Sequence, residues 1–294
     1  MLGAFRKASK QAAGRRRPQP TQAFVMPELP EVETTRRGIA PELSGHTVSG
    51  VVVRNGRLRQ PVPPELAELL TGLTLDTVER RAKYLLFRFP TGSLLVHLGM
   101  SGSLRIVPAS LAPEKHDHLD IVFGPRALRL RDPRRFGLAL WQPGEAPHPL
   151  IAGLGVEPLG EHFDGAWLHT ATRGRKTPVK LFIMDGSQLV GVGNIYASES
   201  LFRAGIDPTT PVGELGPKRC ARLVTSIRET LQDALAAGGS TLRDFVSSSG
   251  MPGYFQQQYF VYGRDGEPCR KCATPIRKRI MGQRATFYCS RCQR

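Results

Sequence analysis

The sequence predicts an α+β protein with several domains: a short N-terminal helix with an antiparallel β-sandwich, a helical domain, and a small C-terminal hairpin held by four cysteines. Short β-rich runs separated by turn residues fill residues 45–142. Helical periodicity replaces them after residue 155, and two Cys-x2-Cys pairs lie close to the C-terminus. A chain of 294 residues is long enough for this division.

The N-terminal helix is expected over residues 27–39, within the stretch MPELPEVETTRRG. Pro30 is acceptable in the first turn of a helix, and Glu31 and Glu33 are favourable near its positive end. Pro27 and Glu28 follow a methionine directly, so the chain has a second possible start of translation at Met26.

The 25 residues before Met26 form a basic extension. They carry six Lys or Arg and no acidic residue, and they lack the apolar core of a secretory signal. This composition fits a disordered basic arm, an organelle transit peptide, or a segment that is not translated. Composition alone leaves these alternatives open.

The charge of the whole chain indicates a polyanionic partner. The formal net charge is +16 with a pI of about 10.3, and +10 remains without the six cations of the extension. Nucleic acid is the expected partner; a solvated basic surface or a ribosome-associated protein is the alternative. No run of about 18 apolar residues occurs, so no membrane span is predicted.

The β-rich part is expected to form a sandwich or barrel interrupted by a helix near residues 63–71. Lys83, in ERRAKYLLF, is placed on a strand facing inward. Loss of hydration would lower the pKa of its ammonium and suit it to proton transfer. The alternative is a surface lysine with a buried stem.

Two turns in this part carry large or basic residues where small polar ones are usual. They are HLGMSGSLR (97–105) and DPRRFG (132–137). Arg134 could contact a nucleic-acid backbone, and Met100 and Phe136 could insert between bases as wedges. For Met100 and Phe136 the alternative is a position in the core, which is commoner for hydrophobic residues. In EKHDHLD (114–120), His116 and His118 share a strand face. We favour a phosphate contact over a His-metal site, because no third ligand stands out.

Helical segments are expected at residues 164–173, 178–184, 194–203, 217–237 and 240–247, with a helix–turn–helix character. Asn194 follows Gly191 and Gly193 and is expected to cap the helix after it. The free N–H groups at such a helix start favour phosphate, although a purely structural cap is commoner.

The C-terminal hairpin is expected to bind zinc through Cys269, Cys272, Cys289 and Cys292, with 16 residues between the two pairs. Two disulfides are the alternative, which the lack of an export signal disfavours. Residues 276–280 and 285–288 alternate like two strands. Arg284 stands beside their turn, where it is either a phosphate ligand or one more solvated charge.

Several of these stretches together resemble the bacterial formamidopyrimidine-DNA glycosylase (Fpg) family. They are MPELPEVETTRRG, RRAKYLL, HLGMSGSLR, EKHDHLD, DPRRFG, VGVGNIYASESLF and the final CxxC…QRATFYCSRC. The resemblance covers residues 26–294 in the family's order. It implies a catalytic β-sandwich domain (27–155), a helix–two-turn–helix DNA-binding domain (156–262) and a zinc finger (263–294), with residues 1–26 as an extension.

The resemblance also implies an activity: base-excision repair by removal of oxidised purines, such as 8-oxoguanine and formamidopyrimidines, followed by strand cleavage through β,δ-elimination. It implies one structural zinc ion, double-stranded DNA with oxidised bases or abasic sites as partner, and no membrane. A monomer in the bacterial cytoplasm is expected, with organelle targeting by residues 1–25 as the minor alternative.

Matched residue by residue, the resemblance assigns Pro27 as the Schiff-base nucleophile and Glu28 as its proton donor. Lys83 and Arg284 match the proton donors for β- and δ-elimination. The positions matched to DNA contacts are His116, Arg134, Arg175 and Asn194 on the backbone, with Met100, Arg134 and Phe136 filling the void of the flipped base. SSSGMPGYF (247–255) matches the loop that closes over that base.

One feature departs from the family pattern: Pro27 lies inside the chain, where its nitrogen is an amide without nucleophilic character. A terminal proline is instead a secondary amine able to form a Schiff base. We therefore expect the active chain to begin at Pro27, by translation from Met26 or by cleavage. A chain that keeps residues 1–25 is expected to bind DNA without catalysis. The nearest enzyme alternative, endonuclease VIII-like and directed to oxidised pyrimidines, typically starts PEGPE rather than PELPEVE.

Overall fold

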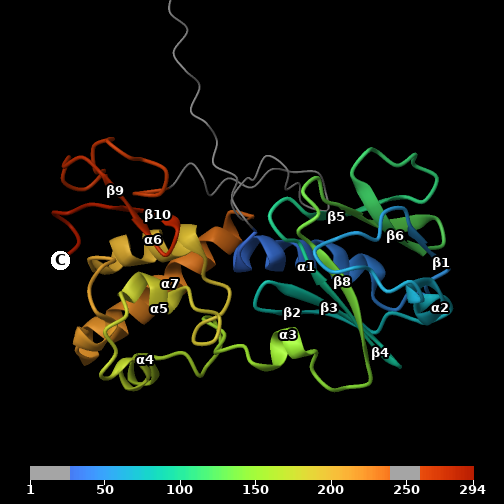
Figure 1. Cartoon of the computed structure of the whole chain (residues 1–294), viewed down its shortest axis with the longest axis horizontal. Coiled ribbons are helices and arrows are strands. Elements are labelled where there is room, and N and C mark those ends of the chain that lie inside the picture. Colours follow the sequence, from blue (N-terminus) through green and yellow to red (C-terminus); the bar gives the residue numbers. More distant parts are fainter. Residues whose placement is uncertain (1–26, 239–258) are drawn as a thin grey trace, which may run out of the picture.

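The computed structural model describes residues 27–238 and 259–294, which form two lobes. Figure 1 shows the β-sheets in one lobe, the helices α4 to α7 with the C-terminal hairpin in the other, and α1 between them. The predicted α+β order of helix with sandwich, helical domain and hairpin is confirmed. None of the described helices combines the length and apolar character needed to cross a membrane.

The helices are α1 (Leu29–Leu43), α2 (Leu66–Leu70), α3 (Pro149–Ala152), α4 (Gly165–Thr172), α5 (Val179–Ile183), α6 (Asn194–Ala204) and α7 (Pro217–Ala236), with a 3-10 turn η1 (Val212–Glu214). The strands are β1 (Gly50–Val53), β2 (Thr77–Arg81), β3 (Tyr84–Phe89), β4 (Gly92–His97), β5 (Ser103–Pro108), β6 (Asp117–Phe123), β7 (Arg126–Arg131), β8 (Leu138–Pro143), β9 (Arg277–Met281) and β10 (Arg284–Tyr288).

Helix α1 begins near the expected residue but is longer than expected. Pro30 occupies its first turn as predicted, and the Glu28 N–H donates to Glu31 Oε2 at 2.9 Å, which fixes the helix start. The helix continues past residue 39 and includes Pro41. A proline so close to the helix end removes one backbone hydrogen bond, and the complete burial of Leu43 holds the last turn against the core.

The β-rich part is a sandwich of two antiparallel sheets, as predicted. One sheet has the strand order β2-β3-β4-β8 and the other β1-β6-β7-β5. Alternate residues of both sheets point into one apolar core, such as Leu85 and Phe87 from the first and Leu119 and Leu128 from the second. Helix α1 packs against this lobe through Val32 and Ile39.

The helical lobe has its own core, centred on the packing of α6 against α7. The expected segments from residue 164 to residue 237 all contain helices, whereas the short α3 was not expected. Segment 240–247, predicted as a helix, lies outside the described residues. The C-terminal hairpin of β9 and β10 shares a core with this lobe, because Phe287 packs in one cluster with Phe202 of α6.

Candidate active site and nucleic-acid interface

The carboxylate of Glu28 lies at the N-terminus of α6. It accepts hydrogen bonds from the backbone N–H of Gly193 at 2.7 Å and of Ile195 at 3.1 Å. A helix N-terminus favours an anion, and here the protein supplies it. The interpretation that these N–H groups are free for phosphate is therefore wrong. A Cβ on Gly193 would lie 2.4 Å from Glu28 Oε1, which explains why glycine stands there.

Burial and neighbouring charges oppose each other at Glu28 and Lys83. Burial raises the pKa of Glu28, and the cationic Lys83 partly offsets this. Burial lowers the pKa of Lys83, Glu28 partly offsets this, and the positive charge of Arg284 lowers it further. The three residues predicted as acids and bases thus form one electrostatically coupled site, built from the start of α1, the β2–β3 hairpin and the start of β10.

Lys83 lies in the turn between β2 and β3, so its predicted position on a strand is wrong. Arg81 pairs with Tyr84 in the antiparallel register, which leaves Ala82 and Lys83 as the turn. Ala82 has a φ of +55°, a left-handed conformation that reverses the chain direction. The turn presents Lys83 towards Glu28, the charged group that most strongly affects its pKa.

Asn194 is the first helical residue of α6 and does not cap it; the cap is Gly193. The Asn194 amide instead joins the helix to the hairpin. Its Nδ2 donates to the Ala285 carbonyl at 2.9 Å, and its Oδ1 accepts from Lys180 Nζ at 2.6 Å. Lys180 is fully buried and also donates to Thr286 Oγ1 at 2.7 Å.

Sequence reasoning missed Lys180, because a lysine at the start of a short helix carries no local signal of burial. Burial lowers the pKa of Lys180 to about 8, with Glu28 opposing and Arg284 adding to the shift. Lys180 therefore belongs to the same electrostatic site.

The turns expected to touch nucleic acid are held by the buried carboxylate of Asp132. It accepts from Ser101 Oγ at 2.6 Å and from the Gly137 N–H at 2.8 Å, and Ser101 Oγ accepts from the Arg134 N–H at 3.1 Å. The Arg134 guanidinium lies 4.9 Å from the centre of the Phe136 ring, and Phe136 is 44% exposed. Phe136 is thus a surface residue, and the alternative of a core position is wrong.

The turn that contains Met100 is in close contact with the turn that contains Phe136. Gly99 has a φ of +65°, and a Cβ there would lie 2.4 Å from the Phe136 carbonyl carbon. A glycine at position 99 is therefore required for the two turns to approach this closely, and the neighbouring Met100 is half-buried.

The two predicted histidines have different environments. His118 is buried, and its Nε2 lies 2.8 Å from the Asp132 carbonyl oxygen. His116 is half-exposed just before β6. Within residues 27–238 and 259–294, the cysteine cluster is the only group of three or more side chains placed to hold a metal. No His-metal site is found there, and a phosphate contact of His116 stays a prediction.

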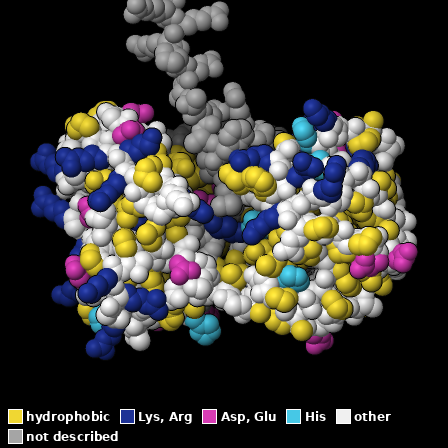
Figure 2. All heavy atoms as spheres, viewed as in Figure 1, with side chains coloured by type: hydrophobic (Ala, Val, Ile, Leu, Met, Phe, Trp, Pro, Cys, Tyr) yellow, Lys and Arg dark blue, Asp and Glu magenta, His cyan; other side chains and the backbone are white. Residues whose placement is uncertain are grey.

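Arg175 and Arg284 are both exposed. Arg175 follows α4, and its guanidinium lies 5.5 Å from the Phe182 ring. Arg284 opens β10 beside the hairpin turn, as predicted. Figure 2 shows Lys and Arg side chains on both sides of the hollow between the lobes, which favours an anionic ligand there.

The four predicted zinc ligands come together at the base of the hairpin. Their Sγ atoms all lie within 4.8 Å of one another, with Cys269–Cys292 at 3.9 Å and Cys272–Cys289 at 3.4 Å. A tetrahedral zinc ion with Zn–S bonds of about 2.3 Å places its sulfur ligands about 3.8 Å apart. The cluster therefore fits one structural zinc ion. The disulfide alternative is wrong, because all of these thiols are free.

A buried carboxylate that the sequence did not reveal fixes the approach to the finger. Glu199 of α6 accepts from the backbone N–H groups of Phe260, Val261 and Tyr262 at 2.9, 3.0 and 2.8 Å. These bonds join α6 to the segment just before the cysteine cluster. The predicted closing loop, 247–255, lies outside the described residues.

Three family profiles match the chain in order. "Formamidopyrimidine-DNA glycosylase N-terminal domain" matches residues 26–139, "Formamidopyrimidine-DNA glycosylase H2TH domain" matches 154–246, and "Zinc finger found in FPG and IleRS" matches 266–294. A curated relative named formamidopyrimidine-DNA glycosylase, from Aromatoleum aromaticum, is 64% identical over 270 residues, which are 92% of this chain and 100% of the relative. One of the same name from Bordetella pertussis is 57% identical with the same coverage.

Solved structures are similar over almost the same length. The Fpg protein from Thermus thermophilus has a TM-score of 0.82 at 38% identity, covering 91% of this chain and 98% of that one. A Lactococcus lactis Fpg in complex with DNA containing an abasic site has a TM-score of 0.84 at 32% identity, with 91% and 99% covered. A Lactococcus lactis Fpg variant bound to DNA containing Fapy-dG also scores 0.84, at 33% identity, with 91% and 100% covered.

Proposed function

This chain belongs to the formamidopyrimidine-DNA glycosylase family, and on that premise we propose that it is a base-excision repair enzyme. It excises oxidised purines such as 8-oxoguanine and formamidopyrimidines from double-stranded DNA and then cuts the strand as an abasic-site lyase. The observation that carries the proposal is the interaction of the charges of Glu28, Lys83 and Arg284, with Glu28 next to Pro27 in the chain. The solved relatives with Fapy-dG and abasic-site DNA support this substrate class.

The proposed chemistry starts from a free amine on Pro27. Its lone pair attacks the sugar C1′ and the bond from C1′ to the base breaks, so that the base leaves with the bonding electrons and is protonated from solvent. The proline nitrogen then loses its own proton, and its lone pair opens the sugar ring to a cationic iminium as O4′ takes a proton from Glu28. The raised pKa of Glu28 favours the protonated form that this step needs.

The iminium acidifies the C2′ hydrogen, and removal of that proton expels the 3′ phosphate in β-elimination; δ-elimination then expels the 5′ phosphate. Lys83 is the proposed proton donor for the first elimination and Arg284 for the second. Both side chains belong to the electrostatic site that contains Glu28, which supports these roles.

We propose that the active chain begins at Pro27. The N-terminal family profile starts to match at residue 26, and the relative from Aromatoleum aromaticum matches over its whole length while 92% of this chain is covered. Both observations support a family start next to Pro27. A chain that keeps the preceding residues has an amide at this nitrogen and is expected to bind DNA without forming the Schiff base.

The remaining proposals concern the DNA contacts, the oligomeric state, the location in the cell and the domain bounds. We propose backbone contacts for His116, Arg134, Arg175 and Asn194, and void filling by Met100, Arg134 and Phe136, all on the described residues. Asn194 would contact DNA in addition to holding Ala285 and Lys180. We also propose a monomer in the bacterial cytoplasm, with domains 27–155, 156–262 and 263–294.

Borohydride trapping on an 8-oxoguanine duplex tests the function. A chain beginning at Pro27 is expected to give a covalent adduct, and the chain retaining residues 1–26 none. Intact-mass measurement of both preparations verifies their N-termini. No adduct from either chain would support a non-catalytic DNA-binding protein, and faster trapping on oxidised pyrimidines would support the endonuclease VIII-like alternative. An adduct from the intact 294-residue chain would refute the start at Pro27.

A further inference from the structure

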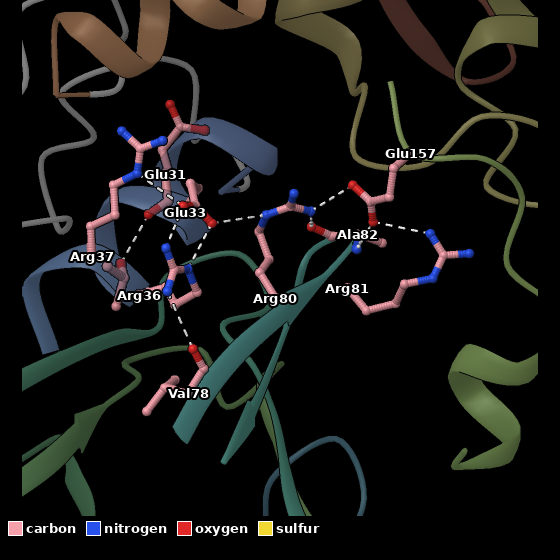
Figure 3. A network of polar contacts seen from close by, with 10 residues as sticks. Glu31, Glu33, Arg36, Arg37, Val78, Arg80, Arg81, Ala82 and Glu157 are labelled. Atoms are coloured by element: carbon pink, nitrogen blue, oxygen red, sulfur yellow. Dashed lines mark hydrogen bonds and ion pairs between the residues drawn. The ribbon is translucent and has the colours of Figure 1, made fainter. Parts of the chain in front are cut away.

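The turn that carries Lys83 is fastened by a carboxylate from the other side of the domain boundary. The Ala82 N–H donates to Glu157 Oε1 at 2.7 Å, and Arg81 Nη1 donates to the same oxygen at 3.0 Å. Arg80 Nη1 donates to the second oxygen, Oε2, at 2.8 Å (Figure 3). Glu157 thus receives three donors from consecutive residues of the β2–β3 hairpin.

Arg81 extends this attachment to the backbone of the connecting segment. Its Nη2 donates to the carbonyl of Leu154 at 2.8 Å and to that of Gly155 at 2.5 Å. Because Arg81 bonds Glu157 through one nitrogen and two carbonyls through another, its guanidinium has a fixed orientation. The side chains of Arg81 and Glu157 are 28% and 25% exposed, so solvent competes only weakly for these bonds.

The connecting segment is itself attached to the loop before α6. The Gly155 N–H donates to the Gly186 carbonyl at 2.9 Å, the Val156 N–H to the Gln188 carbonyl at 3.0 Å, and the Val190 N–H back to the Val156 carbonyl at 3.0 Å. A Cβ on Gly155 would lie 2.1 Å from the Gln188 carbonyl oxygen, so the two backbones are in direct contact.

The same loop also holds Glu28. The Gly191 carbonyl accepts from the Leu29 N–H at 3.1 Å, and the Gly193 N–H donates to Glu28 Oε2 at 2.7 Å. Residues 186–193 therefore contact the Glu28 peptide at one end and, through residues 154–157, the Lys83 turn at the other. Loop 186–193 of the helical domain therefore fixes the positions of both proposed proton-transfer groups of the β-sandwich domain, Glu28 and Lys83.

We propose that Arg81 and Glu157 are positioning residues that set the Lys83 amine relative to Glu28 by tying the β2–β3 turn to loop 186–193. This inference rests on the elimination role given to Lys83 in the proposed function. Neither residue touches the reacting atoms; each acts through the backbone of the turn. A shift of about 1 Å in a catalytic group can lower a rate by about 100-fold, so such an attachment has a kinetic consequence.

The test measures strand cleavage at a preformed abasic site, under single-turnover conditions, with chains that begin at Pro27. Glu157→Gln keeps the shape of the side chain but loses the negative charge that holds Arg80 and Arg81. Arg81→Lys keeps the positive charge but loses the planar guanidinium that bonds Glu157 and the two carbonyls at once. Each is expected to slow cleavage about 10- to 100-fold with unchanged DNA affinity. In a Lys83→Ala background, either change is expected to cause no further loss.

The pH dependence of cleavage gives an independent readout. Burial lowers the pKa of Lys83, so a loosened and better hydrated turn brings that pKa back towards its ordinary value. The limb of the pH–rate profile that disappears in Lys83→Ala is expected to move to higher pH in Glu157→Gln. General destabilisation would lower the rate without moving this limb.

Glu79→Gln is the matched control, because Glu79 forms an ion pair with Arg88 at 2.9 Å on the same hairpin, away from the turn. Its cleavage rate is expected to be unchanged. If Lys83→Ala cleaves normally, the role of Lys83 in the proposed function fails. If Lys83→Ala is impaired but both positioning variants cleave normally, or if the losses multiply in the double variants, the positioning proposal is overturned. Should Glu157→Gln not fold, the Arg81→Lys series decides alone.

Discussion

At the residue scale, the absence of a side chain at Gly193 shapes the centre of the site. A Cβ there would lie 2.3 Å from the Glu28 carboxyl carbon, a separation that Cβ atoms do not tolerate. Gly193→Ala is expected to push the carboxylate off the start of α6 and to slow base excision about 100-fold. Single-turnover excision of 8-oxoguanine measures this.

Gly153→Ala serves as the comparison for Gly193→Ala. No heavy atom lies within 4 Å of a Cβ at Gly153, and the φ of −93° suits alanine. This variant is expected to excise normally. Equal rates in the two variants would show that the carboxylate does not depend on Gly193.

The raised pKa of Glu28 predicts that the rate of base excision depends on pH. Burial raises the pKa of its carboxyl, so this proposed proton donor stays protonated to higher pH than an ordinary glutamate. Base excision is expected to fall as pH rises through this raised pKa, because the donor loses its proton. Glu28→Gln cannot titrate and should lack this alkaline limb, at a much lower rate. A limb that survives in Glu28→Gln would assign it to another group.

At the element scale, Asp132 organises the turn of residues 132–137. Asp132→Ala leaves Ser101 Oγ and the Gly137 N–H without their acceptor, at a cost of about 1–3 kcal/mol for each buried polar group left unpaired. The turn then no longer holds Arg134 and Phe136 in place. We expect Asp132→Ala to have a lower Tm than the unchanged protein. We also expect it to lose part of the preference for abasic-site DNA over undamaged DNA of equal length.

Asp76→Ala is the corresponding control, since Asp76 is exposed on the same lobe. It is expected to change neither the Tm nor the preference for abasic-site DNA. If Asp132→Ala lowers the Tm but keeps the full preference, the turn does not need Asp132 for recognition.

The zinc cluster links the hairpin to α6. The hairpin shares its apolar cluster with Phe202, and Arg284 opens β10 next to the electrostatic site. Chelation is expected to release about one zinc per chain, to lower the Tm and to abolish cleavage, because the hairpin loses the ion that supplies much of its folding energy. Zinc release that leaves cleavage intact would contradict this dependence.

Elements with a local signal could be predicted from the sequence, whereas their exact placement could not. Strand alternation, helical periodicity and the Cys-x2-Cys spacing led to the sandwich, the helices and the zinc site. The sequence predicts Lys83 on a strand because a two-residue turn between two apolar strands has no distinctive composition. The sequence predicts Asn194 as a cap because Asn is common at that position, whereas the helix is capped by Gly193, whose missing side chain leaves room for Glu28.

At the scale of the whole molecule, the contacts that build the site join residues far apart in sequence. Glu28 and Gly193 are separated by 165 positions, and Ala82 and Glu157 by 75. Such pairs leave no periodic or compositional trace in a single sequence. For this reason the sequence gives no sign of Glu157, Lys180 or Glu199, whereas the resemblance in the motifs assigns roles to Pro27, Glu28, Lys83 and Arg284.

The basic character of the chain predicts a strong salt dependence of DNA binding. Each cation that contacts a phosphate releases counterions, so affinity falls with salt concentration. Arg134→Gln is expected to reduce the slope of log affinity against log salt by about one. Arg126→Gln should change it little, because Arg126 is paired with Glu42 at 2.6 Å. Equal slopes in both variants would remove Arg134 from the phosphate contacts.

The bond between Glu28 and α6 has a consequence for the newborn chain. A ribosome that has already made Glu28 must add 165 more residues before Gly193 exists. At about 5–20 residues per second this takes roughly 8–33 s. In a chain that begins at Pro27, as proposed, the terminal amine is exposed early in synthesis, whereas the Glu28 carboxylate lacks its Gly193 donor until most of the protein has been made. The proposed catalytic site therefore forms late in synthesis.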